Sequence, residues 1–198
     1  MLTAWRNWRD GRRVKKMGYT EAEWEAAVSD WPVLQRYQGE DRVRLRDLSF
    51  RFLARKSVAP GGGFTITDAM CLRIATMASV PILNLGLDWY DGWYTVILYE
   101  GDFIPNRPWQ SEDGVVHASG PVLAGEAWNQ GPVILSWQSV LEAGQGSNVV
   151  IHEMSHKLDM RRNGANGAPP LHPGMNPRRW HDTFTAAWDR LFGDYEQR

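Results

Sequence analysis

The chain contains one short motif that has the residue types and spacing of a catalytic metal site. It reads His152-Glu153-Met154-Ser155-His156. On an α-helix, residues i and i+4 share a face, so both imidazoles could reach one metal ion. Zinc suits such a pair because it polarises a carbonyl and brings the pKa of its bound water to about 7. Glu153 would then act as general base toward the zinc-activated water and return the proton to a leaving amine.

A catalytic zinc normally takes three protein ligands, and the motif supplies two. The extended pattern HExxHxxGxxH is absent, because Lys157-Leu158-Asp159 and Met160-Arg161-Arg162 follow His156. The third ligand must come from another part of the chain. Four residues have suitable chemistry but weak placement: His172 in a proline-rich loop, His181 on a helix whose packing explains it, His117 on a predicted strand, and Glu196 near the end.

Asp159 follows the motif on the same side of the expected helix. Two interpretations of this carboxylate stay open. It could orient a ligand histidine from the second shell of the metal. It could equally tether the end of the helix or the loop that follows.

The elements around the motif predict an α+β fold. Capping and periodicity predict helices from Thr20 to before Pro32, over about 40–56 and over 69–79, where Thr67 or Asp68 provides the cap. Strands are expected at 94–99 and 133–137, with shorter ones at 115–116 and 122–123, and a loop at 59–63. The motif helix should run from Asn148 to about Arg162. A last helix opens at Asn176-Pro177 with an apolar stripe of Trp180, Phe184, Trp188 and Leu191. Helices, then strands, then helices indicate α+β and not alternating α/β.

Composition narrows the class of protein without naming a function. The chain has 198 residues, 43% of them hydrophobic and 23% charged, which is typical of one globular domain and excludes a disordered chain. With 22 Lys+Arg against 23 Asp+Glu, the net charge of −1 points to neither a nucleic acid nor a membrane partner. Cys71 is the only cysteine, so we expect no internal disulfide and a cytoplasmic setting.

The first 19 residues form a locally basic segment before the main domain, which we expect to span 20–198. Trp5 and Trp8 alternate with six basic residues: Arg6, Arg9, Arg12, Arg13, Lys15 and Lys16. Such a run suits an arm that binds nucleic acid or a membrane surface. Terminal segments are more commonly solvated and partly frayed, and we adopt that interpretation.

Beyond the motif itself, the sequence resembles the zinc metallopeptidases typified by Mlc titration factor A. The resemblance rests on the block from Asn148 to Asp159, on Asn163-Gly164 and Gly167–Leu171 after it, and on Gly125–Trp128 and Gly131–Trp137 before it. The helix end at Phe52–Lys56 and Ile74-Ala75 also match. The similarity extends over nearly the whole chain from about residue 30.

The resemblance implies a zincin-like fold of the glutamate-ligand kind, with N-terminal helices, a small central mixed sheet and the HExxH helix as active-site helix. By position, His152 and His156 would bind Zn²⁺ and Glu153 would be the general base. In this family the third ligand is a glutamate on a later helix, in a Ser-Glu-x-Phe-Phe-like segment. The 198 residues contain no such segment, so we expect a C-terminally short domain with an incomplete zinc site.

Two functions follow from the resemblance. The first is a zinc-dependent peptidase, of aminopeptidase type, that acts on small peptides. The second is a non-catalytic module that sequesters a transcriptional repressor, as the named family member does with Mlc. The intact Glu153 favours the enzyme, because binding alone makes no chemical demand on that carboxylate. The missing third ligand favours the module.

Overall fold

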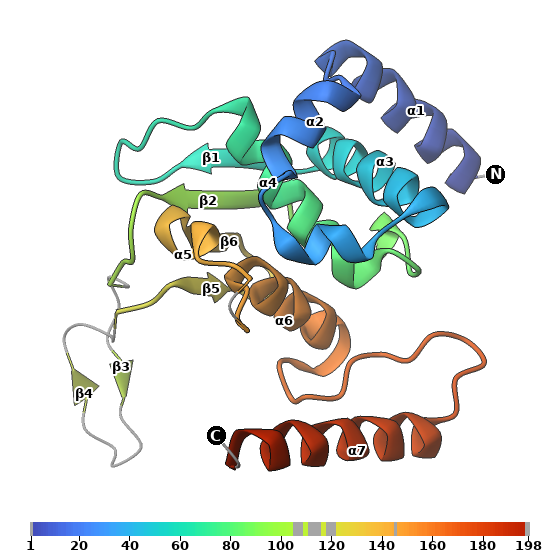
Figure 1. Ribbon diagram of the computed structural model, residues 1–198, viewed down its shortest axis with the longest axis vertical. Helices are drawn as coiled ribbons and strands as arrows, with labels where there is room; N and C mark the ends of the chain where they lie inside the picture. The colour runs from blue at the N-terminus through green and yellow to red at the C-terminus, as the bar shows by residue number, and fades with distance from the viewer. Residues whose placement is uncertain (1, 105–108, 111–115, 118–121, 145, 197–198) are drawn as a thin grey trace.

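The computed structural model describes residues 2–104, 109–110, 116–117, 122–144 and 146–196. These residues form a mixed α+β fold with seven α-helices (Figure 1). The helices are α1 (Leu2–Met17), α2 (Glu21–Val28), α3 (Gly39–Arg55), α4 (Asp68–Ser79), α5 (Trp137–Leu141), α6 (Val149–Asn163) and α7 (Pro177–Glu196). Short 3₁₀ helices lie at Pro32–Arg36, Val80–Ile82 and Leu87–Tyr90. The predicted α+β class and the order of helices around a small sheet are confirmed.

The sheet has four strands in the order β1-β2-β6-β5. β1 (Ser57–Pro60), β2 (Thr95–Tyr99) and β6 (Val133–Ser136) are parallel neighbours, whereas β5 (Gly125–Ala127) runs antiparallel to β6. A parallel pair needs a crossover connection, and α4 provides it between β1 and β2. A separate two-stranded sheet joins β3 (Trp109–Gln110) and β4 (Val116–His117). The antiparallel strand β5 therefore forms one edge of the main sheet.

The hydrophobic core centres on α4, which contacts α2, α3 and α6. Every residue from Leu72 to Ser79 is buried. Trp24 of α2 is fully buried as well, and its indole N–H donates to the Thr76 hydroxyl at 2.8 Å. The helical layer and the sheet thus share one continuous core, to which Val96, Leu98, Val133 and Leu135 contribute from the strands.

Local signals fixed several boundaries as predicted. Thr20 and Glu23 form a reciprocal capping box at the start of α2. Of the two expected caps for α4, Thr67 is the residue whose side chain accepts from the backbone, at Met70 N. The helix predicted over 40–56 is α3, and the helices expected around the motif and after Asn176 are α6 and α7.

Three local expectations were wrong in whole or in part. The segment 59–63 was expected to be a loop; residues 61–63 form a turn, but Ala59 and Pro60 end strand β1, because hydrogen bonding to β2 outweighs their weak strand propensity. Trp137 begins α5, where Ser136 caps the helix, and does not continue the strand. The N-terminal segment is not frayed: it is helix α1, which packs on α3 and buries Asp10 against Arg55.

Two short strands were expected in the central region. Of the pair 115–116, Val116 lies in β4 and residue 115 is outside the described residues. Of the pair 122–123, Leu123 makes an isolated antiparallel bridge with Phe103. Within the described part of the chain, no helix combines the length and apolarity required to cross a bilayer.

Candidate metal centre

Helix α6 places the motif at a fixed point above the edge of the sheet. Its first turn is capped by Asn148, whose side-chain oxygen accepts from Ile151 N at 2.9 Å. Val150 and Met154 are fully buried and anchor the helix in the core. His152 is exposed and His156 is half-buried, so the face that carries the histidines lies beside the core and is open to ligands.

The two imidazoles converge on one point. Their Nε2 atoms lie 3.1 Å apart, and the ring planes are nearly perpendicular at 89°. Two nitrogens bound to one tetrahedral zinc at 2.0–2.1 Å would be separated by about 3.3 Å. The observed separation therefore fits a pair of ligands to a single ion. Partial burial, followed by the neighbouring His156, lowers the pKa of His152 and favours the neutral imidazole that binds metals.

The side chain of Glu153 extends from α6 toward the edge strand β5, and the residue is only 5% exposed. Burial raises the pKa of its carboxyl to about 7, and the negative charge of Glu126 adds to the rise. The backbone N–H of Ala127 donates to the carboxylate and opposes the shift. A group with a pKa near neutrality is suited to accept and release a proton in turn.

Gly125 allows β5 to lie directly against this carboxylate. A Cβ at position 125 would stand 2.8 Å from both Cγ and Oε1 of Glu153, and 2.7 Å from a methyl of Val149. Such distances are too short for any side chain. Glycine at this position is therefore a requirement of the close contact between the strand and the general-base candidate.

The motif borders a cavity with a volume of about 1040 Å³. His152, Glu153 and Gly125 form part of its lining, and Asp102 and Ser139 contribute further polar groups to it. A space of this size holds several residues of an extended peptide. The cavity thus adjoins the part of α6 that carries His152 and Glu153.

The described residues bring together two metal-binding side chains and no larger cluster. Among them, no group of three or more His, Cys, Asp or Glu residues is placed to hold an ion. His172 is exposed and lies beside the carbonyl of Pro173, while His181 on α7 faces solvent next to Asp182. His117 lies in β4 and Glu196 ends α7, and the side chains of both are outside the described residues.

Asp159 is hydrogen-bonded to the loop after α6. Its Oδ2 accepts from Gly167 N at 2.8 Å, which ties residues 164–167 back to the helix. Its other oxygen, Oδ1, is buried without a hydrogen-bond partner in the described structure. Of the two roles considered for this residue, the observed hydrogen bond corresponds to the tether.

Sequence reasoning missed the groups that hold Glu153 and the loop beside it. Gly125, Glu126 and Ala127 surround the carboxylate from β5, but their segment carries no chemical motif of its own. Lys157, immediately after His156, is buried and donates to the carbonyls of Trp128 and Gly131. Its burial lowers its pKa to about 8. This lysine fixes the loop 128–131 to the motif helix.

Comparison with known proteins shows the family of the chain. The family model of the glucose-regulated metallo-peptidases M90 matches residues 5–198. The chain belongs to this family. Proteins named Mlc titration factor A are similar to the chain in sequence: that of Pectobacterium atrosepticum is 37% identical over 174 residues, covering 87% of this chain and 65% of its own length. The protein of the same name from Serratia proteamaculans is 37% identical over 175 residues, covering 87% of this chain and 66% of its own length.

The Cronobacter sakazakii protein of that name is 35% identical over 170 residues, or 85% of this chain and 64% of its own length. The M90 chain described here thus spans about 64–66% of the length of these curated relatives. Membership in a metallopeptidase family is consistent with a metal at the converging histidines.

Proposed function

We propose that this M90 chain is a zinc-dependent peptidase of aminopeptidase type. One observation carries the proposal: the Nε2 atoms of His152 and His156 lie 3.1 Å apart on a helix whose Glu153 borders a cavity of about 1040 Å³. The substrate would be a peptide, and the single free cysteine, Cys71, is in keeping with a cytoplasmic protein.

Each residue of the motif has a distinct role in this proposal. His152 and His156 would hold the ion, which would polarise the scissile carbonyl and lower the pKa of water. Glu153 accepts the proton of the attacking water and delivers it to the leaving amine. The Ala127 N–H keeps the carboxylate oriented toward the cavity from β5. A peptide lying along the free edge of β5 would place its backbone beside this carboxylate.

Zinc binding tests the ligand assignment directly. We expect His152→Ala and His156→Ala each to remove most of the zinc that the chain binds, measured by equilibrium dialysis with metal analysis. His172→Ala and His181→Ala are matched controls, because both histidines lie outside the pair, and they should retain the wild-type zinc content. Equal zinc in all four variants would contradict the site.

The role of Glu153 is tested separately. Glu153→Gln should lower peptidase activity by at least about a hundredfold while zinc content stays unchanged, since the amide cannot accept the proton. Activity is measured with unblocked peptides and with the same peptides blocked at the amino end. Unchanged activity would end the general-base assignment, and equal cleavage of both peptide sets would end the aminopeptidase one.

A second candidate is a module that binds a transcriptional repressor. It is favoured by the name of the relatives, which describes titration of Mlc, and by the presence of only two converging ligands among the described residues. Under this alternative, binding of a repressor of that kind would persist in Glu153→Gln and in His156→Ala. Loss of binding in those variants alone would tie the interaction to the metal centre.

A further inference from the structure

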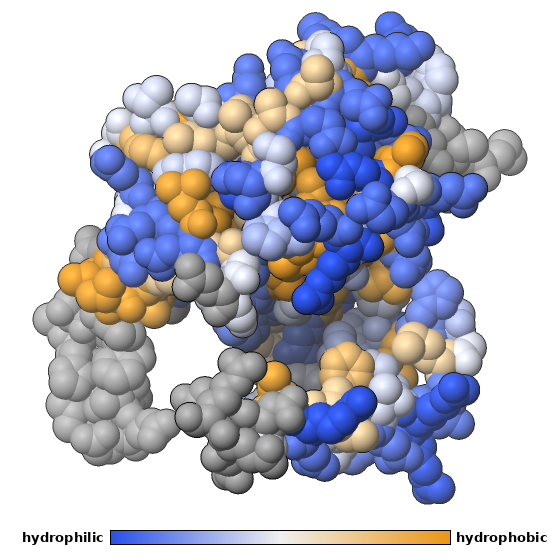
Figure 2. Space-filling view, in the orientation of Figure 1, coloured by the Kyte–Doolittle hydropathy of each residue, from blue (hydrophilic) through white to orange (hydrophobic). Residues whose placement is uncertain are grey.

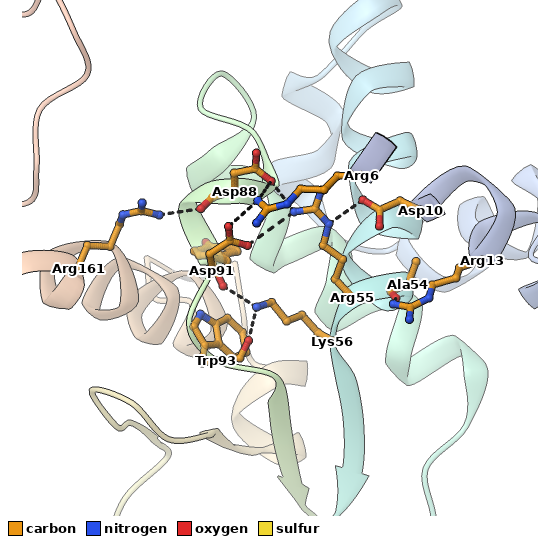
Figure 3. A network of polar contacts seen from close by, with 11 residues as sticks. Arg6, Asp10, Arg13, Ala54, Arg55, Lys56, Asp88, Asp91, Trp93 and Arg161 are labelled. Carbon is orange, nitrogen blue, oxygen red and sulfur yellow. Dashed lines mark hydrogen bonds and ion pairs between the residues drawn. The ribbon is translucent and has the colours of Figure 1, made fainter. Parts of the chain in front are cut away.

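The basic run at the N-terminus is divided by the helix into two sides with different surroundings. Arg6, Arg9 and Arg13 recur at helical spacing and line a cleft together with Arg55 and Lys56 at the end of α3. The other wall of the cleft is the segment from Asp91 to Tyr94. Figure 3 shows how the side chains from α1, from the end of α3 and from this segment meet. Three separate parts of the chain therefore contribute to one positively charged cleft.

Carboxylates neutralise only part of this charge. Arg55 pairs with Asp10 at 2.6 Å and with Asp88 at 2.5 Å, and Arg6 pairs with Asp91 at 2.9 Å. Within the described residues, Arg9, Arg13 and Lys56 make no ion pair. Five cations lining the cleft and three paired carboxylates leave an excess of two positive charges.

Two of the unpaired cations keep donors that the protein does not use. Arg9 Nε is buried and has no hydrogen-bond partner in the described structure. Lys56 is only 6% exposed, and its ammonium donates to the carbonyl of Tyr90 and to that of Trp93, the second of which is labelled in Figure 3. An ammonium has three donors, so one remains. A buried cation with spare donors is stabilised when an anion supplies the missing acceptors.

We propose that the cleft between α1, the end of α3 and residues 91–94 binds a small phosphate-type oxyanion. Its volume of about 240 Å³ is several times the roughly 30 Å³ that one water molecule occupies in the liquid, which leaves room for the ion and a few waters. A phosphate dianion matches the excess charge and offers acceptors to Arg9, Arg13 and Lys56. The ligand is a phosphate group, carried by a small soluble molecule or by a lipid headgroup.

Calorimetric titration of the whole chain with inorganic phosphate, at constant ionic strength, tests the proposal. Arg9→Gln is the informative variant, because Arg9 makes no ion pair whose loss would unfold the protein. Arg12→Gln is its matched control: Arg9 stands 5.0 Å over the Trp5 ring and Arg12 stands 5.0 Å over the Trp8 ring, but only Arg9 lines the cleft. Arg9→Gln should weaken phosphate binding about tenfold, as loss of a charge-assisted hydrogen bond does, and Arg12→Gln should leave it unchanged.

Absence of phosphate binding to the wild-type chain, or equal weakening in both variants, would overturn the proposal. Vesicles that contain phosphatidic acid distinguish the two sources of the phosphate group. Retention on these vesicles that Arg9→Gln lowers and Arg12→Gln preserves would identify the lipid headgroup. If Arg9→Gln and Arg12→Gln lowered retention equally, the vesicles would be bound by general electrostatic attraction to the protein surface, and this result would count against the cleft.

Discussion

Helices α6 and α7 have similar sequence patterns, but the apolar residues of α6 are buried and those of α7 are exposed. Both begin after an asparagine cap, and both carry apolar residues at helical spacing. In α6, Val150 and Met154 are fully buried against the sheet and α4. In α7, Phe184, Trp188 and Leu191 are 58%, 61% and 65% exposed. Figure 1 shows α7 beyond α6, on the side away from the sheet, and apolar side chains are visible at its surface in Figure 2.

The difference shows what an apolar stripe does and does not determine. The periodicity of apolar residues shows which face of a helix is hydrophobic, but not which part of the protein covers that face. The aromatic residues of α7 contact each other along the helix with tilted rings, Trp180 with Phe184 and Trp188 with Phe192. The candidate ligands His152 and His156, by contrast, lie on the helix that is anchored in the core, and this anchoring restricts the movement of the two imidazoles.

The largest contrast should come from truncating one side chain in each helix. Met154→Ala should lower the free energy of unfolding by about 2–5 kcal/mol, because it leaves a cavity in the core. Trp188→Ala should change it by less than about 0.5 kcal/mol, because that ring is exposed. Both values come from urea unfolding followed by circular dichroism. A comparable cost at Trp188 would mean that the stripe of α7 is buried in solution.

Adding one methyl group to a glycine near each helix sharpens the same comparison. Gly125→Ala places a Cβ against Glu153 and should cost about 1–3 kcal/mol of stability through overpacking. Gly193→Ala in α7 meets no atom within 4 Å, and it should be neutral or slightly stabilising. Thermal unfolding measures both. A neutral Gly125→Ala would show that β5 can move away from the carboxylate.

The smallest expected effect concerns the two caps. Asn148 accepts from Ile151 N in α6, and Asn176 accepts from Arg178 N and Arg179 N in α7. Asn148→Ala should reduce global stability by about 1 kcal/mol. Asn176→Ala should fray the start of α7 without changing global stability, which hydrogen exchange resolves residue by residue. Equal global losses would show that α7 unfolds together with the core.

Much of the fold was predictable from local signals. Side-chain caps set the starts of α2, α4, α6 and α7, because a cap satisfies backbone groups that lie within three residues of it. Strand β5 could not be predicted in the same way. Gly125, Glu126 and Ala127 have weak strand propensity, and they form a strand only because they pair with the edge of β6.

The sequence by itself determined the chemistry of the candidate metal centre: helical spacing alone puts His152 and His156 on one face with Glu153 beside them. Only the tertiary structure decided the environment of that chemistry. Burial against β5 raises the pKa of Glu153, and the packing of α1 on α3 turns three arginines of a basic run toward one cleft. These effects depend on residues far apart in the chain. Electrostatic and packing interactions act through space, and no local pattern in the sequence records which distant segment will be the neighbour.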